Sequence, residues 1–299
     1  MAGRLDAVRI HFALFILMAW AGLSLQGQPA PAVSTSAGLT PGQAQALVER
    51  ALATESAAAQ ELSHAAHPMR YRLHKTSPRL SSTKAIVETR EGDVARLLEI
   101  NGQPLSAEDE QKEQERLNAL EANPGLQQHR KQSEDSDAAR AMKVLRVLPS
   151  AFLYDFAGTA TAAGTTVEKF SFKPNPRFDP PDLETGVLTA IAGEIWIDAA
   201  EERVVRLAGS LQQDKNIALG LAELDKGGSV EIEQADVGGR QWRIVHLKLK
   251  MNGRVLFKTK NSDSVQDYTE FVALPADLSY KQAIQMLRAL PAAGAQAGR

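Results

Sequence analysis

The chain has 299 residues, a hydrophobic fraction of 43% and a formal net charge of -2 from 34 basic and 36 acidic side chains. This length and apolar content suffice for one large domain or two small ones. Because basic and acidic side chains are balanced, the chain has no excess of positive charge for binding nucleic acid. Cysteine is absent, which excludes disulfides, thiolate catalysis and zinc-thiolate sites.

Residues 1–32 have the features of an export signal. Arg4 and Arg9 precede an apolar run from Phe12 to Leu25, and Ala30-Pro31-Ala32 offers small residues for cleavage. We expect this segment to be cleaved and the mature protein to be periplasmic or secreted. The alternative is that the segment stays on the chain as an N-terminal anchor.

The first half of the mature chain predicts a helix, three strands and a helical insertion. Thr40-Pro41-Gly42 is typical of a helix start, and short strands are indicated near residues 69–73, 85–88 and 94–100. Residues 106–148 then read as polar, solvent-exposed helices that start at Ser106, are interrupted at Asn123-Pro124-Gly125 and end at Pro149.

The second half reads as a series of antiparallel strands. Apolar side chains alternate in residues 152–156 and 170–172, a rigid proline-rich loop follows at 173–181, and a meander occupies 187–268. Within the meander, Asn252-Gly253 predicts a two-residue hairpin turn. Pro275 to Ser279 introduces a last helix with an apolar stripe, and residues 291–299 are expected to be a disordered tail.

These elements predict an α+β fold: a curved antiparallel sheet, an unclosed β-barrel of about ten strands, with helices packed on its concave face. No linker divides the chain, so we expect residues 33–290 to form a single β-rich domain that carries the helical insertion 106–148.

The sequence contains no recognisable catalytic signature. It lacks a nucleophile elbow and a glycine-rich phosphate loop, and His64 and His67 have no third ligand at a diagnostic spacing. We therefore expect a protein that is not an enzyme, with no catalytic residues, no metal site and no cofactor. A hydrolase with an unrecognised site is a less favoured third interpretation.

Several strands are apolar on both faces, which a sheet with one wet face does not require. Either helices cover the second face or that face lines an apolar cavity. The aromatic residues expected to line such a cavity or its mouth are Phe152, Tyr154, Phe156, Phe170, Phe172, Trp196 and Trp242.

The outline of the whole chain resembles the LolA/LolB-like periplasmic lipoprotein-carrier superfamily and, more closely, uncharacterised secreted bacterial proteins of that outline. The residues that carry the closer resemblance are Arg96–Glu110, Gly193–Gly209, Leu224–Gln234 and Pro275–Leu287. The resemblance implies an unclosed barrel with a helical lid around a cavity that accepts acyl chains. The polar insertion, residues 107–140, departs from the simplest pattern of that superfamily.

Two functions are compatible with this sequence. The first is an exported, non-enzymatic carrier or sensor that binds a lipid or a lipidated partner in an apolar cavity. The second is a structural or protein-interaction module of the cell envelope, with a fully packed sheet and an envelope protein as its partner. Neither function involves nucleic acid or metal.

Overall fold

The computed structural model describes residues 38–63, 67–162, 164–217, 222–255 and 258–291. The predicted export signal, His64 and residues 292–299 of the predicted tail lie outside these ranges. Among the described helices, none is both long and apolar enough to cross a membrane.

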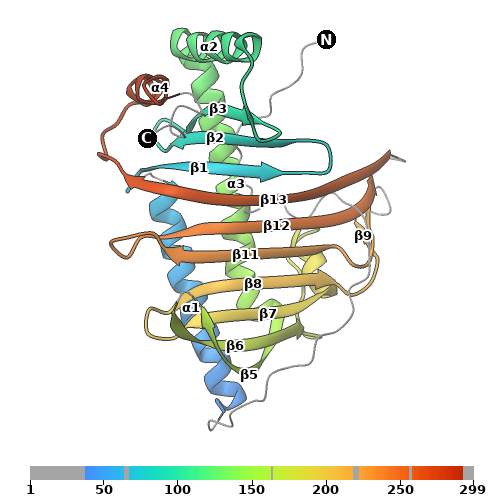
Figure 1. Cartoon of the computed structure of the whole chain (residues 1–299). Coiled ribbons are helices and arrows are strands. Elements are labelled where there is room, and N and C mark those ends of the chain that lie inside the picture. Colours follow the sequence, from blue (N-terminus) through green and yellow to red (C-terminus); the bar gives the residue numbers. More distant parts are fainter. Residues whose placement is uncertain (1–37, 64–66, 163, 218–221, 256–257, 292–299) are drawn as a thin grey trace. The chain divides into compact units, whose positions relative to one another are not determined.

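The strands form an antiparallel sheet, which confirms the predicted α+β class (Figure 1). Its hydrogen-bond order is the open path β4-β3-β2-β1-β13-β12-β11-β8-β7-β6-β5, with β10 paired to β12 and β9 paired to β10. The strands are β1 (Met69–Thr76), β2 (Ser81–Val87), β3 (Val94–Ile100), β4 (Gln103–Pro104), β5 (Phe152–Ala162), β6 (Thr165–Pro174), β7 (Ile191–Asp198), β8 (Arg203–Leu211), β9 (Lys215–Ile217), β10 (Ala222–Leu224), β11 (Ser229–Asp236), β12 (Trp242–Val255) and β13 (Lys258–Ala273).

The helices are α1 (Pro41–Ser63), α2 (Ala107–Ala122), α3 (Pro124–Ala151) and α4 (Tyr280–Arg288), with a short 3-10 helix, η2, at Thr185–Ala190. The described residues fall into two compact units. Within the described ranges, unit 1 comprises residues 58–141 and 266–291, and unit 2 comprises residues 38–57 and 142–265. Each unit is described separately below.

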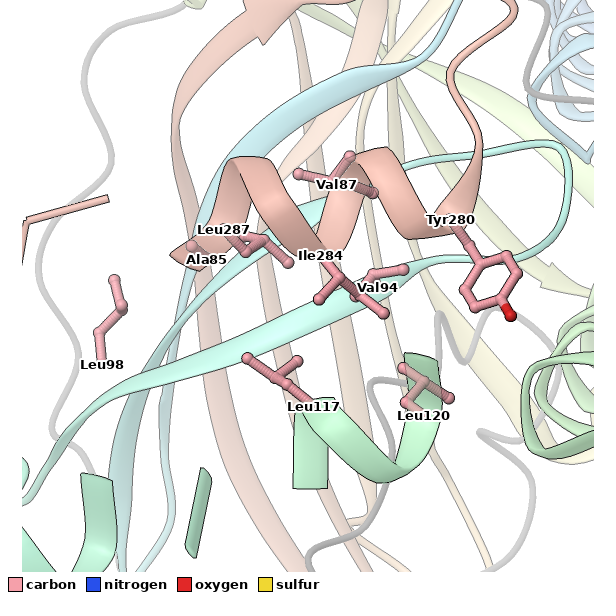
Figure 2. Packing of buried hydrophobic residues seen from close by; sticks show 10 residues of the cluster. Ala85, Val87, Val94, Leu98, Leu117, Leu120, Tyr280, Ile284 and Leu287 are labelled. Carbon is pink, nitrogen blue, oxygen red and sulfur yellow. The ribbon is translucent and has the colours of Figure 1, made fainter. Parts of the chain in front are cut away.

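The core of unit 1 lies between two helices and two strands (Figure 2). The helix α4 contributes Ala283, Ile284 and Leu287, all fully buried. These residues lie on the apolar stripe expected from the sequence, and Ser279 and Gln282 form a capping box at the start of the helix. The core cluster is Ala85, Val87, Val94, Leu98, Leu117, Leu120, Tyr280, Ala283, Ile284 and Leu287.

In unit 1, α2 supplies hydrogen-bond partners to the backbone of β3. Glu113 accepts a hydrogen bond of 2.8 Å from the Leu97 N–H, and Arg116 donates to the Ala95 carbonyl. Glu113 is 2% exposed. The prediction that α2 is only a solvated helix is therefore incomplete, since one polar stripe of α2 lies on the sheet.

The first half of α3 continues this arrangement at Asp93. Glu134 accepts a hydrogen bond of 3.1 Å from the Asp93 N–H, and Arg130 donates to the Asp93 carbonyl at 2.9 Å. Side chains of two helices thus bond the backbone of Ala95 and Leu97 in β3 and of Asp93 just before it, where another strand would otherwise pair. We call these four side chains, Glu113, Arg116, Arg130 and Glu134, the β3 seal.

The hairpin turn predicted at Asn252-Gly253 is wrong, because β12 continues through both residues to Val255. Gly253 lies opposite Leu224 of β10, a strand that the sequence did not indicate. A Cβ atom on Gly253 would stand 2.1 Å from the Glu223 carbonyl oxygen. The glycine therefore permits close approach of another strand and does not form a turn.

Pro149 does not end α3, which extends to Ala151. The carbonyls that have no helical partner near this end are bonded by side chains. Tyr154 Oη donates to the Leu148 carbonyl at 2.9 Å, and Gln45 of α1 donates to the Pro149 carbonyl at 3.0 Å. These bonds satisfy carbonyls of the last turn, so the helix ends two residues later than expected.

Candidate functional site

The candidate site lies in unit 2, on one face of the strands β5, β6, β7, β8, β11 and β12. Directly opposite residues of antiparallel strands point to the same side of a sheet. The cross-strand pairing therefore places Phe170, Ile195, Leu207, Ile232 and Leu247 in one row on this face. We call it the apolar face.

Aromatic rings cover the β5–β6 end of the apolar face. The ring centroids of Phe152 and Phe172 are 4.7 Å apart, and those of Tyr154 and Phe172 are 6.2 Å apart. Phe156 and Phe170 form a second pair with centroids at 5.8 Å. All but Phe156 are at most 5% exposed. The structure thus brings five of the seven predicted site residues together, and four of them are packed as in a core.

Tyr154 fixes the aromatic group to the end of α3. Its hydroxyl donates to the Leu148 carbonyl, and burial raises its pKa above the ordinary value. The phenol therefore stays protonated at neutral pH and remains a hydrogen-bond donor. Tyr154 acts in this position as a structural anchor with an apolar ring.

A pair of glycines lies next to the aromatic group. Gly193 of β7 is opposite Phe172 on one side and Gly209 of β8 on the other. A Cβ atom on Gly209 would stand 3.4 Å from Phe172 Cζ and 2.9 Å from Ile191 Cγ2. Because glycine has no side chain, these two positions leave room for the Phe172 ring. They also make a shallow depression in the apolar face between β6 and β11.

The central residue of the row on the apolar face is less covered than the residues on either side of it. Phe170 and Ile195 are at most 1% exposed and Leu247 is 3% exposed. Leu207 and Val230, from the adjacent central strands β8 and β11, are only half-buried. An apolar surface therefore remains accessible at the centre of a row whose ends are buried.

The structure places Trp196 on the opposite face from the aromatic group. It lies between Lys169 of β6 and Arg206 of β8, whose cationic groups are 4.8 Å and 4.9 Å from the ring centroid. Arg206 also pairs with Glu194 and, at 2.6 Å, with Glu231. Partial burial raises the pKa of Glu194, but the hydrogen bond from Arg206 together with the positive charges of Arg206 and Lys169 brings the pKa below its ordinary value.

Trp242 is also separate from the aromatic group. Its ring lies 5.2 Å from the Arg203 guanidinium, which donates hydrogen bonds of 2.9 Å and 3.0 Å to Glu55 of α1. Glu55 also accepts a hydrogen bond of 2.9 Å from the Val204 N–H. Since Glu55 and Arg203 are 8% and 9% exposed, Trp242 belongs to a buried contact that fastens α1 to β8.

Sequence reasoning did not select Leu207, Val230, Gly193 or Gly209. Leu207 and Val230 are ordinary strand residues, and their partial exposure depends on how helices cover the sheet. The glycines carried a usable signal, because glycine inside a strand often marks close approach of a backbone or a ligand. Among the described residues, no group of three or more His, Asp or Glu side chains could hold a metal ion.

No family model matches this chain, and no curated protein matches its sequence. In fold, it is similar to a LolA superfamily protein from Nitrosomonas europaea, with 12% identity, a TM-score of 0.24, and 76% of this chain and 92% of that one covered. It is also similar to a putative outer membrane lipoprotein-sorting protein domain from Vibrio parahaemolyticus, with 10% identity, a TM-score of 0.27, and coverage of 81% and 99%.

Proposed function

We propose that the chain is an exported, non-enzymatic carrier or sensor that holds an acyl chain of a lipid, or of a lipidated partner, against the apolar face of unit 2. The observation that carries this proposal is the partial exposure of Leu207, the central residue of an otherwise buried apolar row, and of Val230 beside it on the same face. Apolar surface of this kind gains free energy when a ligand removes it from water.

The chemistry of the apolar face suits an acyl chain better than a polar ligand. Its row consists of Phe170, Ile195, Leu207, Ile232 and Leu247, none of which offers a hydrogen bond. Each acyl methylene buried there would contribute about 0.8 kcal/mol without a fixed polar partner. The predicted export signal and an envelope location belong to the same proposal.

Binding of a fluorescent fatty acid to the full-length protein tests this proposal. Leu207→Lys places a charge in the middle of the apolar face, and we expect it to weaken binding roughly tenfold or more because the charge would have to be desolvated. Leu153→Lys is the matched control, since Leu153 lies in β5 of the same unit and is 40% exposed. Equal binding by both variants would contradict the proposal.

A second function, a structural or protein-interaction module with a fully packed sheet, is favoured by one observation. Phe152, Tyr154, Phe170 and Phe172 are at most 5% exposed and pack on one another as core residues do. If the wild-type protein binds no fatty acid at any concentration tested, this function replaces the carrier proposal. The same titration thus decides between the two.

A further inference from the structure

The apolar face of unit 2 has a lysine at one end. Lys215 of β9 is directly opposite Leu224 of β10, and Leu224 is directly opposite Gly253 of β12. Gly253 stands an even number of residues after Leu247 in β12, so both lie on the apolar face. Because directly opposite residues point to the same side of a sheet, Lys215 lies on that face as well.

The ammonium of Lys215 reaches the short helix η2. Its Nζ donates a hydrogen bond of 2.8 Å to Thr189 Oγ1, and both residues are half-buried. Among the residues that the structure describes, no carboxylate pairs with Lys215. The adjacent Asp214 is exposed and accepts a hydrogen bond of 2.7 Å from the Lys226 N–H. Since an ammonium has three N–H donors, two of those of Lys215 remain for a ligand.

This lysine differs from other cations on the strands of unit 2, which form ion pairs with carboxylates. Those cations are Lys169, Lys173, Arg203, Arg206 and Arg254. A hydrogen bond between an ammonium and an anion is about twice as strong as one between neutral groups. A half-buried ammonium with a neutral hydroxyl partner is therefore suited to an anionic ligand.

Lys215 also lies in line with the accessible centre of the apolar face. The strand β12 pairs with β11 up to Lys250 and with β10 from Gly253 onward, so β9 continues the line of β8. Along this line, Leu207 is followed by the depression at Gly209 and then by Lys215. The backbone from Gly209 to Lys215 spans at most about 22 Å. One acyl chain spans about 15 Å, half the hydrocarbon core of a bilayer, so the two lengths are comparable.

We propose that the ligand of the apolar face is an anionic amphiphile, whose carboxylate or phosphate head group pairs with Lys215 while its acyl chain lies along β8 over Gly209. This inference rests on the acyl-chain binding proposed above and adds the charge of the ligand. A neutral amphiphile with the same chain should bind less tightly, because its hydroxyl head group offers the ammonium no opposite charge.

Competition between palmitate and hexadecanol for the full-length protein tests this proposal, with displacement of a fluorescent acyl probe that has a neutral head group as the readout. We expect the wild-type protein to bind palmitate roughly tenfold more tightly than hexadecanol. Lys215→Met should weaken palmitate binding by about the same factor and leave hexadecanol binding unchanged, which also shows that the variant is folded.

Lys173→Met is the matched control. It removes the same charge from an exposed position on β6, where Lys173 pairs with Asp155 at 2.9 Å. Both affinities should stay as in the wild-type protein. Inorganic phosphate, which has the charge but no chain, should leave the affinity for palmitate unchanged.

Two results would overturn the anionic head group and leave acyl-chain binding intact. One is equal affinity of the wild-type protein for palmitate and hexadecanol, and the other is a preference for palmitate that persists in Lys215→Met. Loss of that preference in inorganic phosphate would assign Lys215 to free anions and would also overturn the proposal. If the wild-type protein binds neither amphiphile, both this inference and the proposed function are wrong.

Discussion

At the scale of single residues, the contact between Glu55 and Arg203 is the most consequential in unit 2. Both residues are buried, and Glu55 accepts hydrogen bonds from the guanidinium and from the Val204 N–H. Removing one partner of a buried ion pair leaves a charge without compensation. The pair therefore fixes the position of α1 on β8 more strictly than apolar packing alone would.

Glu55→Ala should lower the free energy of unfolding by about 3–5 kcal/mol, because Arg203 would remain buried without its carboxylate. Urea denaturation, monitored by circular dichroism, measures this change in the free energy of unfolding. Glu202→Ala is the control, because Glu202 pairs with Arg50 of the same helix while both are exposed, and its loss should change stability by less than about 1 kcal/mol. Similar effects of the two substitutions would show that the Glu55 contact is not buried in solution.

In unit 1, the ionisation of Glu134 should have a clear effect on how stability depends on pH. Burial raises its pKa from 4.5 to about 7, against the opposing effects of the Asp93 N–H, Arg130 and Lys131, while Asp135 also raises it. Burial likewise raises the pKa of the neighbouring Asp93. Between the unfolded and folded pKa values of Glu134, the folded state binds more protons than the unfolded state.

The stability of the protein should therefore fall as the pH rises from about 4.5 to about 7, and level off above the folded pKa. Glu134→Gln should remove part of this slope, with Asp93 responsible for the remainder. Thermal denaturation across this pH range checks the expectation, with Glu115→Gln, an exposed position on α2, as the control. An unchanged slope in Glu134→Gln would contradict the assignment.

At the scale of elements, the polar helical insertion has a structural role that could not be inferred from its composition. Along β3 and the residue before it, Glu113 and Glu134 accept hydrogen bonds from backbone N–H groups, while Arg116 and Arg130 donate to backbone carbonyls. Each bond satisfies a backbone group that would otherwise be unpaired in a partly buried place. The insertion thus substitutes for a strand.

Glu113→Ala should cost about 1–3 kcal/mol of stability, because the Leu97 N–H loses its partner while α2 still excludes water. Glu108→Ala is the matched control on the same helix, since Glu108 forms only an exposed pair with Lys112. Chemical denaturation compares the two. Should Glu113→Ala unfold at the same denaturant concentration as the control, the β3 seal would contribute nothing to stability.

Elements with strong local signals could be predicted from the sequence. The stripe of α4 and its Ser279 cap are set by neighbouring residues, and β7 and β8 follow the alternation of Ile195, Ile197 and Leu207. The prediction of a turn at Asn252-Gly253 was wrong because Gly253 pairs with β10, a strand about thirty positions earlier in the chain. Pairing with a strand that is distant in the sequence cannot be predicted from the neighbouring residues alone.

At the scale of the whole molecule, the α+β class with a large antiparallel sheet was predictable, whereas the composition of the site was only partly so. Period-two alternation identified Phe152, Tyr154, Phe156, Phe170 and Phe172, which do lie together. Alternation alone could not assign Trp196 and Trp242, whose surroundings are set by arginines on other strands. Which apolar residues stay accessible depends on helix packing.

The central claim is that the apolar face of unit 2 binds an acyl chain. Native mass spectrometry of the full-length protein, purified from the envelope of its own cells, tests this most directly. We predict that the wild-type protein carries lipid and that Leu207→Lys carries little or none, while Leu153→Lys retains it. A wild-type protein without bound lipid, or a Leu207→Lys variant as fully loaded as the wild type, would contradict the claim.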